Sequence, residues 1–266
     1  MTFQQKLKKI IEKNNSLVCV GLDPVLEKLP KEFLKRQYPF FSFNTFIIDS
    51  THDLVCCYKP NTAFYEALGA QGIGELKKTC DYLRKKYPEI PILLDAKRGD
   101  IGNTNTGYTK FAFDYVGADG ITLHPYLGKD SLEPFLQQKD KGLFILCHTT
   151  NAGAGEIQDI QVSGKPLYKI IAQKVIHEWN THNNCMLVLG AAYPQQLAQI
   201  RKMAGEMTFL VPGIGSQGGD IQKVVQAGLN SQNMGLLINS SRGIIFAKNP
   251  RENAEKLRSE INQYRL

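Results

Sequence analysis

Short runs of apolar residues recur along the chain, and segments with helical spacing of apolar positions lie between many of them. Runs of this length that are rich in valine, leucine and isoleucine are typical of parallel strands buried on both faces. Eight runs are predicted to be strands, at residues 17–22, 54–58, 91–95, 119–123, 143–147, 185–189, 208–211 and 235–239. The segments with helical spacing are 72–87, 103–116, 165–180, 194–204, 219–227 and 251–263.

Eight alternating strand and helix units favour one architecture. A (β/α)8 barrel has this number and commonly fills about 250 residues, whereas a doubly wound sheet usually has five or six strands. The chain has 266 residues, and no linker, low-complexity tract or change of composition divides it. The sequence therefore predicts an α/β protein with a single (β/α)8 barrel domain over residues 1–266. An N-terminal helix over about residues 3–13 is expected before the first strand.

The charge balance adds little to this picture. The chain has 32 basic and 25 acidic residues, a formal net charge of +7. Part of the excess lies on the polar side of the N-terminal helix, which predicts a solvated helix face rather than a nucleic-acid site. We expect no nucleic-acid partner, although a basic protein is well suited to binding phosphorylated anions.

Targeting signals and cysteine usage narrow the expected location. No apolar run is long enough to span a membrane, and the N-terminal residues lack the apolar segment of a signal peptide. The six cysteines fall mostly within apolar runs and lack the spacing of a metal site. Reduced thiols in a cytoplasmic protein, with no membrane association, are the expectation.

The segment that follows the third predicted strand carries the strongest chemical signal. Asp95, Lys97 and Asp100 occur within six residues of each other. In an extended chain, Asp95 and Lys97 point to the same face. Ionisable residues at the end of a buried strand are costly unless they are paired, which favours a functional site. The alternative is a surface cluster of salt bridges.

The last two loops predict a phosphate site. The segment 212–219 contains four glycines before a helix, so its backbone N–H groups can converge on an anion. Arg242 follows the eighth predicted strand and offers a guanidinium for a bidentate contact. Phosphate groups commonly bind at the loops after strands seven and eight of this barrel. The alternative is a flexible turn beside a surface arginine.

These motifs resemble the orotidine 5′-monophosphate decarboxylase family, in its longer bacterial subgroup. The family signature D-x-K-x-x-D-I-x-x-T stands here as Asp95, Lys97, Asp100, Ile101 and Thr104. Lys59 matches the lysine of the preceding strand, and Asp23 resembles an aspartate that contacts the ribose. The matches run in the family's order from about residue 17 to residue 247.

The resemblance implies decarboxylation of orotidine 5′-monophosphate to uridine 5′-monophosphate and CO2 in pyrimidine biosynthesis. It implies a catalytic set of Lys59, Asp95, Lys97 and Asp100, with Lys97 stabilising and then protonating the C6 carbanion. The remaining substrate-binding residues that it implies are Asp23, Ile101, Thr104, Thr150, Gly213, Gly215, Gln217 and Arg242. In the family, the second aspartate with its isoleucine and threonine enters the neighbouring subunit's site, so a homodimer is expected. No cofactor and no metal are expected.

One motif departs from the subgroup's pattern. The subgroup usually has Thr-Ser-Asn-Pro-Gly after strand five, whereas this chain has Thr-Thr-Asn-Ala-Gly at 149–153. The serine's hydrogen bond to the pyrimidine ring then falls to Thr150, whose hydroxyl has the same capacity.

Three other interpretations stay open at this stage. A sugar-phosphate decarboxylase or hexulose-phosphate synthase of the same superfamily would carry D-x-K-x-x-D but use a divalent metal. A Schiff-base aldolase would use Lys97 as a covalent nucleophile, against the effect of two nearby aspartates. A non-catalytic module that binds a phosphorylated ligand or a nucleic acid would show no turnover.

Overall fold

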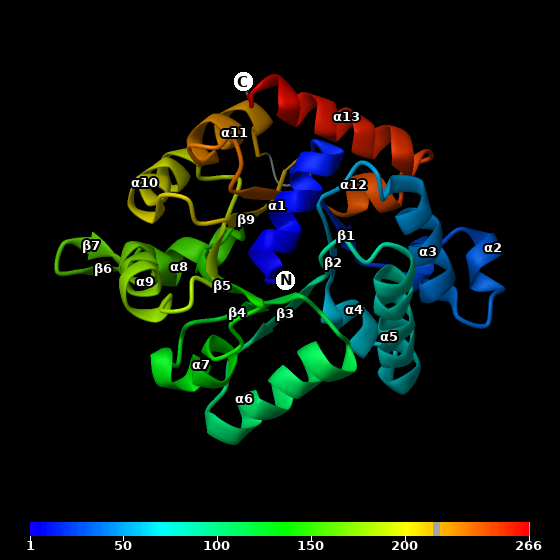
Figure 1. The fold of residues 1–266 in the computed structure, drawn as a ribbon, viewed down its shortest axis with the longest axis horizontal. Coiled ribbons are helices and arrows are strands. Elements are labelled where there is room, and N and C mark those ends of the chain that lie inside the picture. Colours follow the sequence, from blue (N-terminus) through cyan, green and yellow to red (C-terminus); the bar gives the residue numbers. More distant parts are fainter. Residues whose placement is uncertain (215–218, 266) are drawn as a thin grey trace.

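The computed structural model describes residues 1–214 and 219–265. In this part of the chain, eight parallel strands form one sheet that curls into a barrel surrounded by helices (Figure 1). This confirms the predicted fold class. The strands, in the order of the sheet, are β2 (Cys57–Pro60), β1 (Val18–Leu22), β10 (Leu236–Ser240), β9 (Phe209–Pro212), β8 (Cys185–Leu189), β5 (Gly142–His148), β4 (Gly120–Leu123) and β3 (Leu93–Arg98).

The barrel closes between β2 and β3 through two isolated pairs rather than a continuous ladder. Tyr58 pairs with Ile92, and Asn61 pairs with Asp95, both in parallel orientation. The other neighbouring strands are joined by runs of two or more paired residues. This joint therefore brings Asn61, just after β2, next to Asp95 in β3.

Helices follow most strands and cover the outside of the barrel (Figure 1). They are α1 (Phe3–Asn14), α2 (Lys31–Leu34), α3 (Pro39–Thr51), α4 (Thr62–Glu66), α5 (Gly69–Lys86), α6 (Gly102–Thr109), α7 (Lys129–Leu136), α8 (Gly155–Gln158), α9 (Leu167–Lys174), α10 (Pro194–Ala204), α11 (Ile221–Gly228), α12 (Arg242–Ile245) and α13 (Pro250–Gln263). A two-stranded hairpin, β6 (Gln161–Val162) and β7 (Lys165–Pro166), projects beside α8 and α9. None of the helices in the described residues is both long and apolar enough to cross a membrane.

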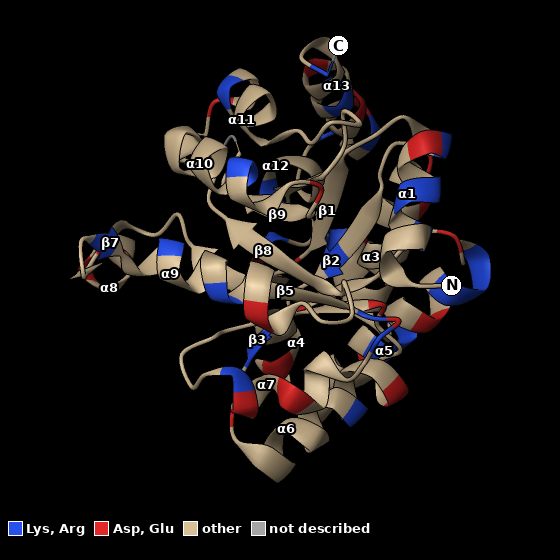
Figure 2. Ribbon diagram, turned by 60° about the vertical axis from the view of Figure 1, so that its left-hand side comes forward, with Lys and Arg blue, Asp and Glu red and all other residues tan. Residues whose placement is uncertain are grey.

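Helix α1 lies against the ends at which the strands begin. The Phe3 ring packs edge-on against Phe144, with 5.5 Å between ring centroids. The ring also rests on Gly142, where an added Cβ would lie 2.7 Å from it. The apolar side of α1 is buried, and its lysines contribute to the mixture of positive and negative residues around the barrel (Figure 2). The opposite rim, where the strands end, remains available for a site.

The structure corrects two predicted strand boundaries. The second strand was predicted over 54–58 and the third over 91–95, whereas β2 runs to Pro60 and β3 to Arg98. Lys59 and Lys97 therefore lie within strands rather than after them, and Asp95 lies inside β3 rather than at its end. A charged residue can sit inside a buried strand here because the charges face one another across the joint.

The structure also contains helices that are not among the predicted segments. Helix α3 buries residues at helical spacing, and Pro39 at its start is a helix-start signal. Helix α7 is short and contains Pro134. Two of the predicted helices are not α-helical throughout, because residues 110–115 and 175–179 form π-helical turns.

Candidate active site

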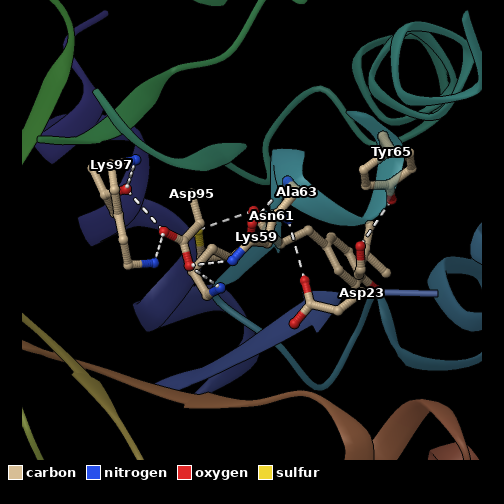
Figure 3. Close-up of polar contacts among 11 residues, drawn as sticks. Asp23, Lys59, Asn61, Ala63, Tyr65, Asp95 and Lys97 are labelled. Carbon is tan, nitrogen blue, oxygen red and sulfur yellow. Dashed lines mark hydrogen bonds and ion pairs between the residues drawn. The ribbon is translucent and has the colours of Figure 1, made fainter. Parts of the chain in front are cut away.

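Asp95 is the centre of a charged cluster at the joint between β2 and β3 (Figure 3). Its Oδ2 accepts a hydrogen bond from Lys59 Nζ at 2.9 Å, and its Oδ1 accepts one from Lys97 Nζ at 2.6 Å. The side-chain nitrogen of Asn61 lies 3.3 Å from Oδ2, and the hydroxyl of Thr122 lies 2.9 Å from Oδ1. The carboxylate thus has two donors on each oxygen, two of which are cations.

These contacts decide the ionisation of the buried pair. Burial alone would raise the pKa of Asp95, but the charges of Lys59 and Lys97 hold it well below its ordinary value. Burial alone would lower the pKa of Lys59, but the carboxylates of Asp95 and Asp23 raise it above its ordinary value. Both side chains are therefore charged at neutral pH.

Lys97 differs from Lys59 in its exposure and its backbone. The side chain of Lys59 is 4% exposed, whereas that of Lys97 is 50% exposed. Lys97 has a φ of 46°, a left-handed conformation that is unfavourable for a residue with a Cβ. Strained residues of this kind gather at functional sites, where the surrounding structure holds them in place.

Asn61 connects this cluster to a second aspartate. Its backbone N–H donates to Asp23 Oδ1 at 3.2 Å, while its side chain reaches Asp95 (Figure 3). Asp23 follows β1 and is almost fully buried. A carboxylate in this position is suited to accepting hydrogen bonds from ligand hydroxyls.

Two cavities meet at the cluster. One, of about 490 Å³, extends from Asp23 and Lys59 to Gly213 and Arg242. The other, of about 420 Å³, extends from Lys97 and Thr122 to the loop 149–151 after β5. Both are lined by Lys59, Asp95 and Pro212. The two cavities can therefore hold two parts of one ligand, with the charged cluster between them.

The structure brings most of the predicted site residues to these cavities. Asp23, Lys59, Asp95, Gly213 and Arg242 line the first, and Lys97 and Thr150 line the second. The Arg242 guanidinium forms no ion pair with any residue in 1–214 or 219–265, so its charge is available to an anion. The predicted residues Gly215 and Gln217 lie outside the described residues.

Asp100, Ile101 and Thr104 are placed differently. Asp100 accepts a hydrogen bond from the backbone N–H of Ile101 at 2.7 Å, and in the described part of the chain it pairs with neither Lys97 nor Lys59. Ile101 is 64% exposed, and Thr104 lies on the exposed side of α6. In the described residues, no hydrogen bond or ion pair joins these three residues to the charged cluster of their own chain. Thr104 instead lines an apolar groove with Ile73, Tyr108 and Phe111.

His124 follows β4 and His148 is the last residue of β5, and both rings pack against neighbouring residues. His148 is buried between the rings of Tyr168 and Tyr193, and its Nε2 lies 3.0 Å from Asp159. Burial lowers the pKa of His148. The ring of His124 rests on Gly99, where an added Cβ would come within 2.6 Å of its Nε2. Neither histidine lines the two cavities.

Several residues of the site were not singled out from the sequence. Asn61 lies two positions after the predicted site residue Lys59, and Thr122 lies inside the predicted strand 119–123. Asn239 Oδ1 and Ser241 Oγ are buried without a hydrogen-bond partner in the described residues, and both residues line the first cavity. A polar residue inside an apolar strand, as at Thr122 and Asn239, is the signal that could have found them.

Within residues 1–214 and 219–265, no three His, Cys, Asp or Glu side chains gather as a metal site would require. Asp95 is surrounded by lysine, asparagine and threonine donors instead.

Comparison with known proteins agrees with this geometry. The chain is 47% identical over 261 residues to orotidine 5′-phosphate decarboxylase of Cellvibrio japonicus, covering 97% of this chain and 95% of that one. It is 45% identical over 271 residues to the protein of the same name from Janthinobacterium sp., with 99% of each chain covered. Among solved structures, Leishmania donovani OMP decarboxylase matches with a TM-score of 0.89 and 38% identity, over 100% of this chain and 99% of that chain.

A model of one protein family also matches this chain. The match extends over residues 16–257, and so includes all the strands that carry the charged cluster. The chain belongs to the orotidine 5′-phosphate decarboxylase / HUMPS family.

Proposed function

We propose that this protein decarboxylates orotidine 5′-monophosphate to uridine 5′-monophosphate in pyrimidine biosynthesis. The observation that carries the proposal is the position of Asp95, which binds two lysines on the wall shared by two cavities. The full-length relatives named orotidine 5′-phosphate decarboxylase support the same reaction.

The cavities suggest how the nucleotide binds. The phosphate would lie in the first cavity, against the Arg242 guanidinium and the backbone of Gly213. The ribose hydroxyls would face Asp23, Lys59 and Asn61. The pyrimidine would enter the second cavity, with C6 beside Lys97 and the ring near Thr150.

The chemistry requires a fixed positive charge. When CO2 leaves C6, the electron pair of the broken bond stays in an orbital orthogonal to the ring π system, so the ring carbonyls do not delocalise it. The Lys97 ammonium would stabilise this pair and then donate a proton to C6, forming the product. Two unit charges ~4 Å apart attract by about 4 kcal/mol at an effective dielectric near 20. This is too little alone, so preorganised neighbours and phosphate binding energy must supply the remainder.

The metal-dependent alternative is less well supported by the site. A sugar-phosphate enzyme of the superfamily would need carboxylates free to bind a divalent cation. Here both oxygens of Asp95 are hydrogen-bonded, and each is bonded to a lysine. The Schiff-base alternative is also weak, because an ammonium bound to a carboxylate at 2.6 Å is a poor nucleophile.

The placement of Asp100 supports a homodimer with shared sites. In the described residues, Asp100, Ile101 and Thr104 form no hydrogen bond or ion pair with their own cluster, and the large apolar side chain of Ile101 is exposed. A second copy packed on this surface would bury Ile101, and the proposed dimer places Asp100 beside the partner's Lys97. A cytoplasmic location agrees with six unpaired, buried cysteines.

The test is a spectrophotometric assay of the purified protein with orotidine 5′-monophosphate, with and without a chelator. We expect turnover that the chelator does not change and no covalent trapping of substrate by borohydride. Lys202→Ala, at an exposed position on α10, is a control that should retain full activity. Absence of turnover, or turnover that the chelator abolishes and Mg²⁺ restores, would overturn the proposal.

A further inference from the structure

The strand that carries Lys97 is bulged opposite a single residue of its neighbour. Leu94 pairs with Ile121 and Arg98 pairs with Leu123, so three residues of β3 stand opposite Thr122 alone. Bulges of this kind bend a strand and re-aim its side chains, and they occur often beside active sites. The three residues include both Asp95 and Lys97.

Thr122 fills the gap in the ladder with its side chain. Its Oγ1 accepts a hydrogen bond from the backbone N–H of Lys97 at 2.9 Å. The same hydroxyl donates to Asp95 Oδ1 at 2.9 Å, the oxygen that also accepts from Lys97 Nζ at 2.6 Å. One buried hydroxyl therefore contacts the backbone of the lysine and the carboxylate that orients its ammonium.

The backbone of Lys97 needs such a contact. A left-handed conformation is unfavourable for lysine, and it persists only where the surrounding structure holds it. The side chain is half exposed and has four rotatable bonds, so a small change at its Cα would move the ammonium widely. The hydrogen bond from the Lys97 N–H to Thr122 Oγ1 fixes the amide at the base of this side chain.

We propose that Thr122 is a positioning residue that holds the β3 bulge and thereby aims the Lys97 ammonium. Its hydroxyl, rather than its shape, carries this role. The proposal rests on the proposed function, in which Lys97 acts at C6, and it adds a residue that acts through Lys97 and Asp95. A valine at this position would keep the volume but leave the Lys97 N–H without an acceptor and Asp95 with one donor fewer.

The experiment compares Thr122→Val with Thr122→Ser and with wild type. Wild-type turnover is measured first, so failure of the proposed function is seen separately. In Thr122→Val we expect kcat to fall by about ten- to a hundred-fold, as loss of a hydrogen bond to charged groups implies. Thr122→Ser keeps the hydroxyl and should recover kcat to within about threefold of wild type. The dissociation constant for the product, uridine 5′-monophosphate, should stay within about twofold in both variants.

Thr79→Val is the matched control. Thr79 is also a fully buried threonine whose hydroxyl is hydrogen-bonded, to Glu75 and Asn44, but it lies on α5. Its loss should lower the melting temperature without lowering kcat. Three results would overturn the proposal: an unchanged kcat in Thr122→Val, an equal loss in Thr122→Ser, or a parallel weakening of product binding.

Discussion

Lys59 and Asp95 form an ion pair with 2.9 Å between Nζ and Oδ2, and neither side chain is more than about a tenth exposed. A buried pair of this kind is weak evidence of net stabilisation, but removal of one partner leaves an uncompensated charge. The remaining contacts of Asp95, to Lys97, Asn61 and Thr122, limit this cost without removing it.

Replacing Lys59 by methionine should therefore destabilise the fold. We expect the free energy of unfolding at neutral pH to fall by about 3–5 kcal/mol, measured by urea denaturation. Lys13→Met is the matched control, because Lys13 pairs with Glu89 on the surface at 2.8 Å. That exposed pair should contribute about 0–1 kcal/mol. A loss in Lys59→Met no larger than in the control would show that Asp95 does not need Lys59.

The same pair predicts a pH dependence. Because the pKa of Asp95 is lowered in the folded protein, its stabilisation is present above about pH 4, the ordinary aspartate value, and is lost as the pH falls toward the lowered pKa. The stability difference between wild type and Lys59→Met should therefore narrow in acid. A difference that stayed constant to pH 2 would contradict an ionised Asp95 as its cause.

Lys97→Ala should abolish turnover while product still binds. Its main contribution arises as the carbanion forms, so kcat should fall far more than affinity for uridine 5′-monophosphate. Asp95→Ala should also be inactive, because Lys97 loses its orienting partner. Retention of more than about a tenth of the wild-type kcat by Lys97→Ala would disprove the proposed mechanism.

Arg242→Ala should weaken engagement of the phosphate. Loss of one charge-assisted contact should cost about 2–5 kcal/mol in kcat/KM for the nucleotide, or some 30- to several-thousand-fold. Orotidine, which lacks the phosphate, should be affected little. Equal losses on both substrates would show that Arg242 does not bind the phosphate.

A mixed dimer of Lys97→Ala and Asp100→Ala tests the shared site. Each variant alone should be inactive, but one site of a mixed dimer keeps a native Lys97 and a native Asp100. Random reassortment makes about half of the dimers mixed, so about a quarter of all sites should regain activity. The measurement is turnover per site after subunit exchange in mild denaturant. Exchange without recovery would place Asp100 in the site of its own subunit.

The sequence predicted the barrel because its strands are short, apolar and regularly spaced. It predicted Asp95 and Lys97 because charge at the end of an apolar run is conspicuous. The strand boundaries at Lys59 and Asp95 were wrong, since hydropathy ends a strand at the first charge, whereas paired charges let the strand continue. Pairing between segments far apart in sequence is not visible in a local pattern.

Thr122 shows a second limit of prediction from the sequence. Its proposed role depends on a bulge in β3. The sequence of β4, where Thr122 lies, does not predict that bulge. The left-handed backbone of Lys97 is equally hidden, because lysine rarely adopts it and no glycine marks the position. The apolar groove beside Thr104 joins residues from three segments, so only the fold reveals it.

The sparse pairing of β2 with β3 has a consequence for folding and for tolerance of mutation. At this joint, Asp95 forms one of the two backbone bridges and also the ion pair with Lys59. The joint between β2 and β3 is therefore held by the same side chains that we propose for catalysis. An intermediate with this joint open would have most of its sheet but no assembled site, so activity should return only after the joint has closed. Variation at Asp95 is then constrained twice, by chemistry and by closure of the barrel.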